Sequence, residues 1–119
     1  MPENVHIDYA RKIIRVVSYG TVSAEDLHNA LRSVMELKEE QGIYKVLVDA
    51  KNQEHPPGIK AYYNFVKVIP SELRIALLVN ATGNNRDLQH MVEAFAEAQG
   101  KKMKLFYDED QALLWLKMQ

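Results

Sequence analysis

The residues best suited to chemistry lie at the end of one apolar run. Residues 44–49 are nearly continuous in apolar side chains, so we expect a buried strand there, followed by a loop at 50–58. This arrangement would put Asp49 at the carboxyl edge of a sheet, where α/β folds usually bind ligands or partners. Glu54 and His55 belong to the same loop, and a histidine oriented by a carboxylate can act as a general base.

A simpler interpretation competes with catalysis. Aspartate commonly hydrogen-bonds the backbone amides of a turn, and Pro56 and Pro57 would hold His55 in an extended loop. The sequence places no nucleophile, metal triad or oxyanion-binding feature beside these residues. We therefore favour a protein that is not an enzyme, with no catalytic residue and no cofactor.

Metal and anion sites find little support. The chain has no cysteine, and His6, His28 and His90 are well separated, with no partners at metal-ligand spacing. The stretch Gly83-Asn84-Asn85 before an expected helix could offer backbone amides to an anion. Capping of that helix by an asparagine explains the stretch better, because the Gly-rich fingerprint of nucleotide sites is missing.

The composition of the 119-residue chain is that of one ordinary globular domain spanning residues 1–119. Fifteen basic and sixteen acidic residues give a formal net charge of −1, so no electrostatic case exists for nucleic acid. The longest apolar run, 75–79, is too short to span a bilayer, and the first residues lack the basic and apolar regions of a signal peptide. We expect a cytoplasmic protein with no integral membrane segment.

The first part of the chain predicts a hairpin and a helix. Apolar and polar side chains alternate at 5–9, and 13–19 is rich in β-branched residues, so we expect two antiparallel strands around a turn at 10–12. Ser23 and Asp26 form a capping-box pattern before an apolar stripe at helical spacing, and Gly42 supplies the stop. Such a helix would bring the strand at 44–49 parallel to the strand at 13–19.

A second helix is expected between Gly58 and a stop at Pro70. Its apolar residues occupy two faces, with Tyr62 on one and Phe65 on the other. A helix that is apolar nearly all round is usually covered on more than one side, so a second subunit or a ligand is expected over one face. Tyr62 and Phe65 therefore join Asp49 and His55 as candidate residues for binding a ligand or partner.

The remaining elements complete an α/β order. Strands are expected at 72–79 and 103–106, with a helix between them that stops at Gly100, and a last helix opens at Asp108. The order is ββαβαβαβα. It predicts an α/β fold with a mostly parallel sheet, an antiparallel N-terminal strand and a cover of helices.

Over nearly its whole length the chain resembles the SpoIIAA-like proteins of the STAS (anti-sigma-factor antagonist) superfamily. The resemblance rests on the hairpin, the helix entry at 20–23, the strand Lys45-Val-Leu-Val-Asp49 and the ending Phe106-Tyr-Asp-Glu-Asp-Gln-Ala-Leu-Leu-Trp115-Leu116. It implies a SpoIIAA/STAS-like fold and no enzyme activity, because true anti-sigma-factor antagonists bind a kinase-like partner. A Ser or Thr after the Asp is their phosphorylation switch. Here no hydroxyl residue lies between Asp49 and Tyr62, so that switch is expected to be absent.

Two hypotheses for function remain. The first is a domain that acts through a protein partner, self-association included, and its motive is the two-sided apolar helix. The second is a carrier or sensor of a small amphipathic ligand in a pocket between that helix and the sheet. Related folds of the lipid-exchange type bind amphipathic molecules, which is what the second hypothesis draws on.

Overall fold

The computed structural model describes residues 3–80 and 86–119. The strands are β1 (Glu3–Asp8), β2 (Ile13–Thr21), β3 (Lys45–His55), β4 (Arg74–Leu78) and β5 (Lys102–Phe106). The helices are α1 (Ala24–Gln41), α2 (Ile59–Val68), α3 (Arg86–Ala98) and α4 (Glu109–Lys117). The predicted ββαβαβαβα order is confirmed. No helix within the two described ranges has the length and apolar character needed to cross a bilayer.

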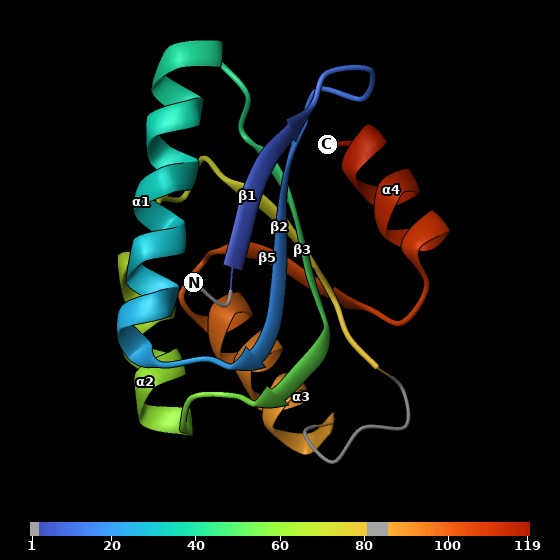
Figure 1. Cartoon of the computed structure of the whole chain (residues 1–119). Coiled ribbons are helices and arrows are strands. Elements are labelled where there is room, and N and C mark those ends of the chain that lie inside the picture. Colours follow the sequence, from blue (N-terminus) through green and yellow to red (C-terminus); the bar gives the residue numbers. More distant parts are fainter. Residues whose placement is uncertain (1–2, 81–85) are drawn as a thin grey trace.

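The five strands form one sheet in the order β1-β2-β3-β4-β5. The β1 strand is antiparallel to β2, and the other neighbours are parallel, as predicted. Because each crossover from β2 to β5 moves to the next strand in the same direction, right-handed connections place their helices on one face. Figure 1 shows this arrangement, with α1, α2 and α3 on one side of the sheet and α4 on the other.

The sheet therefore separates two apolar layers. Neighbouring residues Val46 and Leu47 of β3 are 2% and 0% exposed and belong to different layers, which confirms that the middle of this strand is buried on both faces. The larger layer joins the sheet to three helices through residues that include Ile14, Val34, Val66, Ile75, Val92 and Ala96. The smaller layer joins it to α4 through Ile13, Leu47, Ala76, Leu78, Ala112 and Leu116.

Local signals set the helix ends where the sequence predicts them. Ser23 and Asp26 form the reciprocal capping box of α1, and Gly42 closes that helix with φ of 69°, a left-handed conformation that glycine adopts without strain. The Asp108 side chain accepts a hydrogen bond from the Asp110 amide at the start of α4. The expected capping of the third helix by Asn84 or Asn85 falls outside the described residues.

The end of β3 differs from the prediction. The expected loop at 50–58 is mostly strand, because β3 continues to His55 and pairs with the end of β2. Tyr19 pairs with Asn52, and Gly20 pairs with Gln53, after a shift of register beyond Val17. The polar residues of this stretch have a poor intrinsic strand preference, and the long neighbouring strand overrides it. Asp49 therefore lies within β3 and does not end that strand, although it is level with Leu78 and Phe106, the last residues of β4 and β5.

The two-layer arrangement makes a direct prediction about stability. Leu47→Ala should lower the free energy of unfolding by about 2–5 kcal/mol, because it leaves a cavity in a layer where Leu47 has no exposed surface. Leu114→Ala in α4 is the control, since Leu114 is 53% exposed, and it should change stability by less than about 0.5 kcal/mol. Urea unfolding followed by circular dichroism measures both variants, and equal losses would contradict the burial of Leu47.

Candidate functional site

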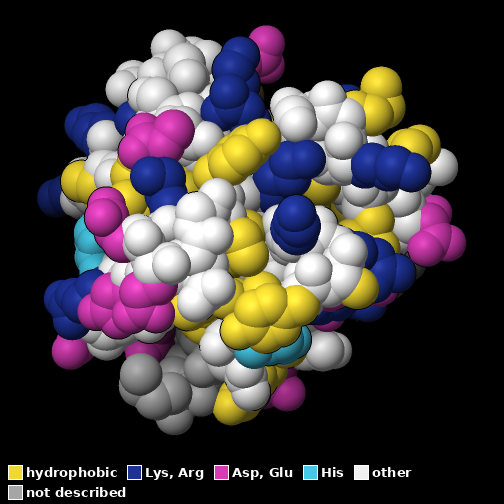
Figure 2. Space-filling model, turned by 90° about the horizontal axis from the view of Figure 1, so that it is seen from above, with side chains coloured by type: hydrophobic (Ala, Val, Ile, Leu, Met, Phe, Trp, Pro, Cys, Tyr) yellow, Lys and Arg dark blue, Asp and Glu magenta, His cyan; other side chains and the backbone are white. Residues whose placement is uncertain are grey.

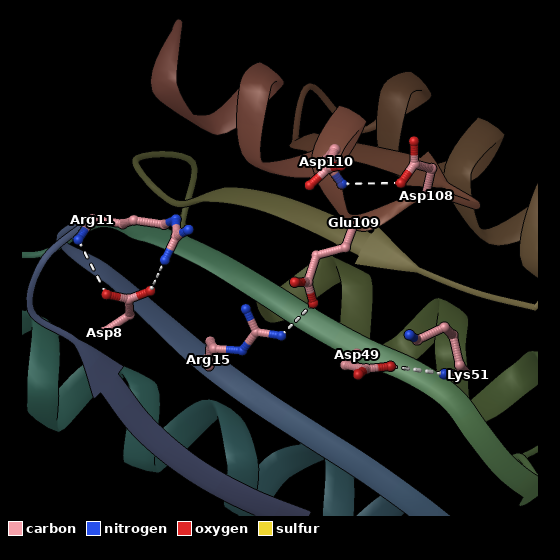
Figure 3. Close-up of polar contacts among 8 residues, drawn as sticks. All are labelled: Asp8, Arg11, Arg15, Asp49, Lys51, Asp108, Glu109 and Asp110. Carbon is pink, nitrogen blue, oxygen red and sulfur yellow. Dashed lines mark hydrogen bonds and ion pairs between the residues drawn. The ribbon is translucent and has the colours of Figure 1, made fainter.

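Asp49 lies in the central strand, level with the end of β4, on the sheet face that α4 packs against. It pairs in register with Val17 of β2 and Leu78 of β4, and it lies two residues after Leu47, which packs against α4. Its Oδ1 atom accepts a 3.2 Å hydrogen bond from the backbone amide of Lys51 (Figure 3). This local contact to the backbone is the simpler of the two roles that the sequence leaves open for Asp49.

The structure does not bring Asp49 together with Glu54 and His55. His55 is exposed at the end of β3, and six residues of extended chain at about 3.3 Å each put it roughly 20 Å from Asp49. A carboxylate cannot orient an imidazole across that distance. The three residues therefore cannot act together, because the segment predicted as a loop is a strand that carries His55 away from Asp49.

A charged pair on the Asp49 face of the sheet joins β2 to α4. The Arg15 Nη2 atom donates to Glu109 Oε1 at 2.5 Å, and Figure 3 shows both side chains on the same side of the sheet as Asp49. Glu109 lies in the first turn of α4, so the pair holds the start of that helix against the sheet. Among the described residues no group of histidine and carboxylate side chains could hold a metal ion. The geometry here is structural and offers no acid–base pair.

Tyr62 and Phe65 lie in a different place, on the three-helix face of the sheet. Both line an apolar cavity of about 70 Å³ between α1, α2 and the sheet. Ala30 and Leu31 of α1 form one wall, and sheet residues such as Val48 form the floor. The four candidate residues thus fall into three places, and only Tyr62 and Phe65 share a site.

A short chain of hydrogen bonds borders this cavity. Gln53 Nε2 donates to the hydroxyl of Ser18 at 2.9 Å, and the Tyr62 hydroxyl donates to Gln53 Oε1 at 3.3 Å. Ser18 has no exposed surface. Gln53 and Ser18 are not among the residues predicted from sequence, because Gln53 was assigned to a loop. The serine interrupting the apolar run of 13–19 is the only sequence signal for this chain of contacts.

The two apolar faces of α2 have a structural cause. Tyr63 stacks on Phe95 of α3 with ring centroids 4.2 Å apart. The rings of Phe65 and of His28 in α1 pack in a T-shaped arrangement with their centroids 6.0 Å apart. The middle helix of three is thus covered by the sheet and by both neighbours, and Val68, 53% exposed, is its most open large apolar side chain.

Exposed apolar and basic side chains gather at the end of the molecule where strands β3 to β5 begin. Three segments far apart in sequence meet here: the β1–β2 turn, the start of β3 and the end of α4. Figure 2 looks onto this end and shows Lys and Arg side chains spread over its α4 half (right), with hydrophobic side chains between them. We call this the amino-end surface and define it as Tyr9, Arg11, Lys12, Tyr44, Lys45, Leu114, Lys117 and Met118.

An ion pair fixes the turn of this surface. The Arg11 guanidinium donates to Asp8 at 3.0 Å and the Arg11 amide donates to the same carboxylate at 3.1 Å (Figure 3). The backbone and side-chain hydrogen bonds from Arg11 hold the pKa of Asp8 below its usual value of 3.8. Asp8 therefore stays charged at neutral pH, and the turn that carries Arg11 keeps its shape.

The buried hydrogen-bond chain yields a testable prediction. Gln53→Leu should lower the free energy of unfolding by about 1–3 kcal/mol, because it leaves the fully buried Ser18 hydroxyl without the amide that donates to it. In a Ser18→Ala background the same change should cost less, since no hydroxyl is then left unpaired. Denaturant unfolding of the four proteins gives the coupling, and additive losses would contradict the contact.

Comparison with known proteins places this fold. No protein-family model and no curated protein sequence matches the chain. The chain is similar to the crystal structure of an uncharacterised protein of the DUF3478 family, with a SpoIIAA-like fold, from Shewanella loihica PV-4. The similarity has a TM-score of 0.61 and 19% sequence identity, and it covers 96% of this chain and 91% of the other. An identity this low establishes the fold alone: the chain has the SpoIIAA-like α/β fold that its sequence predicts.

Proposed function

We propose that this chain is a non-enzymatic, STAS-like interaction domain that binds a protein partner through the amino-end surface. The observation that carries the proposal is the concentration of exposed side chains there. Of the eight exposed large hydrophobic side chains in the described part of the chain, Tyr9, Tyr44, Leu114 and Met118 lie at this one end. A clustered apolar surface set among charged residues is typical of a protein-binding site, whereas single exposed apolar residues need no explanation.

The geometry around Asp49 supports a role without catalysis. The carboxylate is bonded to a backbone amide, and the histidine that could act with it lies at the far end of the same strand. The interaction role also does without a phosphorylation switch of the usual kind, since residues 50–61 contain no hydroxyl side chain. These features favour a role in binding over a role in catalysis.

Self-association through α2 now has little support. The sequence argument for it was a second apolar face, and α1 and α3 cover the flanks of that helix. Val68 is the apolar residue of α2 still open to a partner. We therefore place the partner-binding surface at the amino end and keep α2 as the competing location.

A matched pair of substitutions separates the two locations. Leu114 and Val68 are each 53% exposed, one on the amino-end surface and one on α2. Leu114→Asp should abolish recovery of the partner protein that co-purifies from the native cell, because it puts a charge into an apolar contact. Val68→Asp should leave recovery unchanged. Quantitative mass spectrometry of tagged wild type and both variants makes the comparison.

The reverse result would locate the contact on α2 and contradict the proposal. Recovery at the wild-type level with both variants would show that neither surface binds the partner. Thermal unfolding of each variant serves as the folding control, and since both positions are more than half exposed we expect changes within about 0.5 kcal/mol.

The cavity beside Tyr62 favours a second candidate function, the binding of a small ligand. Its walls are apolar, and Gln53 and Tyr62 supply hydrogen-bonding groups at one side, the combination found in small-molecule sites. Its volume of about 70 Å³ is well below the roughly 300 Å³ of a drug-sized pocket. A lipid-like molecule would need the helices to move apart, so the structure favours a smaller, largely apolar ligand with one polar group.

Filling the cavity tests this candidate. Ala30 lines the cavity from α1, so Ala30→Leu should displace a bound molecule and remove its adduct from the native mass spectrum. Val68→Leu is the control, because Val68 lies outside the cavity lining. A clean apo mass for wild type, together with a more stable Ala30→Leu variant, would show that the cavity is only a packing void.

A further inference from the structure

We propose that the groove between the β1–β2 turn and α4 binds a short acidic segment of another protein, with one of its apolar side chains inserted into the groove. The inference rests on the proposed protein-binding function and adds the place and the chemistry of the partner. It is carried by three features of the amino-end surface: its concave shape, its apolar floor and the sign of its charge.

The groove is large enough to take a side chain of a bound peptide. It has a volume of about 540 Å³ and runs along α4 beside the hairpin turn. Its α4 wall is formed by Asp110, Leu113, Leu114 and Lys117, whose spacing of three, four and seven residues puts them on one helix face. Ile13, which is 2% exposed, forms part of the apolar floor. An apolar side chain of the partner would be buried against Ile13, Leu113 and Leu114.

The charge of the groove favours an acidic partner. Arg11, Lys45 and Lys117 line it, and a second hollow of about 480 Å³ shares Arg11 and Lys45 with it and adds Lys12. Three acids lie close by, and one of them, Glu72, lines an adjacent hollow with Tyr44 and is paired with Lys38. Asp8 is paired with Arg11 and takes up one of the five N–H donors of its guanidinium, and Asp110 lines the end of the groove nearer the start of α4. The amino-end surface is thus left with an excess of positive charge.

Helix dipoles explain only part of this excess. A cation in the last turn of a helix is stabilised by the free carbonyl groups there, which accounts for Lys117 of α4. Arg11, Lys12 and Lys45 line the second hollow together with Gln41 and Gly42 at the C-terminal end of α1, so part of their charge complements that helix end as well. Lys45, Arg74 and Lys102 also stand side by side across β3, β4 and β5, and like charges opposite one another destabilise a sheet. Binding of an anion offsets that cost.

The occupant is another protein and not a second copy of this chain. The densest acidic run of the chain is Asp108, Glu109 and Asp110. In the fold, Asp108 caps α4 and Glu109 is paired with Arg15, so two of its three acids are already bound internally. A long polyanion such as nucleic acid is disfavoured by the net charge of −1 over the whole molecule. The groove instead matches a segment that brings a few carboxylates and one apolar anchor.

Selection from a random 12-residue peptide library displayed on phage tests the proposal. We expect the selected peptides to be enriched in Asp and Glu together with Leu, Ile or Phe. The affinity of wild type for a synthetic selected peptide, measured by fluorescence anisotropy, should fall as salt is raised. At constant salt, the affinity of the Lys45→Glu, Lys117→Glu double variant should be at least about tenfold lower than that of wild type. The control is the double variant Lys51→Glu, Lys60→Glu, which makes the same change of charge at exposed positions outside the groove lining and should keep the wild-type affinity.

The other outcomes separate this inference from the function on which it rests. Neutral or basic peptides whose binding Leu114→Asp abolishes would overturn the acidic chemistry but keep the protein-binding surface. A library that yields no binder would count against both. Acidic peptides that bind the Lys45→Glu, Lys117→Glu variant as well as wild type would overturn the location. Peptide-free protein that sediments as a dimer, dissociated by the same variant, would make the occupant a second copy and contradict the proposal.

Discussion

The consecutive order of the strands is the constraint on which the rest of the molecule depends. Because β2, β3, β4 and β5 follow one another across the sheet, each right-handed crossover puts its helix on the same face. Three helices crowd that face, and only α4 remains for the other (Figure 1). The strand order never reverses, so the sheet lacks the crevice at a switch point where many α/β proteins bind ligands. The middle helix, α2, must be apolar on both flanks simply to pack.

The unequal cover of the sheet explains where apolar surface is left exposed. A single helix such as α4 is only about 10–12 Å wide with its side chains, whereas five strands at about 4.8 Å spacing are roughly 19 Å across. The helix is held over the centre by Ala112 and Leu116 and at its start by the Arg15–Glu109 pair. It cannot also cover the hairpin side of the sheet. The groove beside α4 and the exposed residues around it are left because this helix covers only part of the sheet. The Lys and Arg side chains there give the amino-end surface its positive charge.

The sequence was sufficient for the order of elements but not for the site, and the difference is physical. Capping by Ser23, the stop at Gly42 and the burial of Val46 and Leu47 are decided by local preference and hydrophobic period, which a sequence displays directly. The true end of β3 is decided by pairing with β2, a contact between distant segments that Gln53 does not reveal. The amino-end surface was missed for the same reason. Its residues come from 9–12, 44–45 and 114–118, and only the tertiary fold makes them neighbours.

We propose that the chain binds its partner at the end of the molecule beside α4 and not through the face built from α1 and α2. Hydrogen exchange measured on the protein alone and bound to the partner that co-purifies with it tests this claim most directly. We predict that binding slows exchange in the β1–β2 turn, at the start of β3 and in the last turns of α4, and leaves α1 and α2 unchanged. Protection confined to α1 and α2, with the turn and α4 exchanging as in the free protein, would contradict the account.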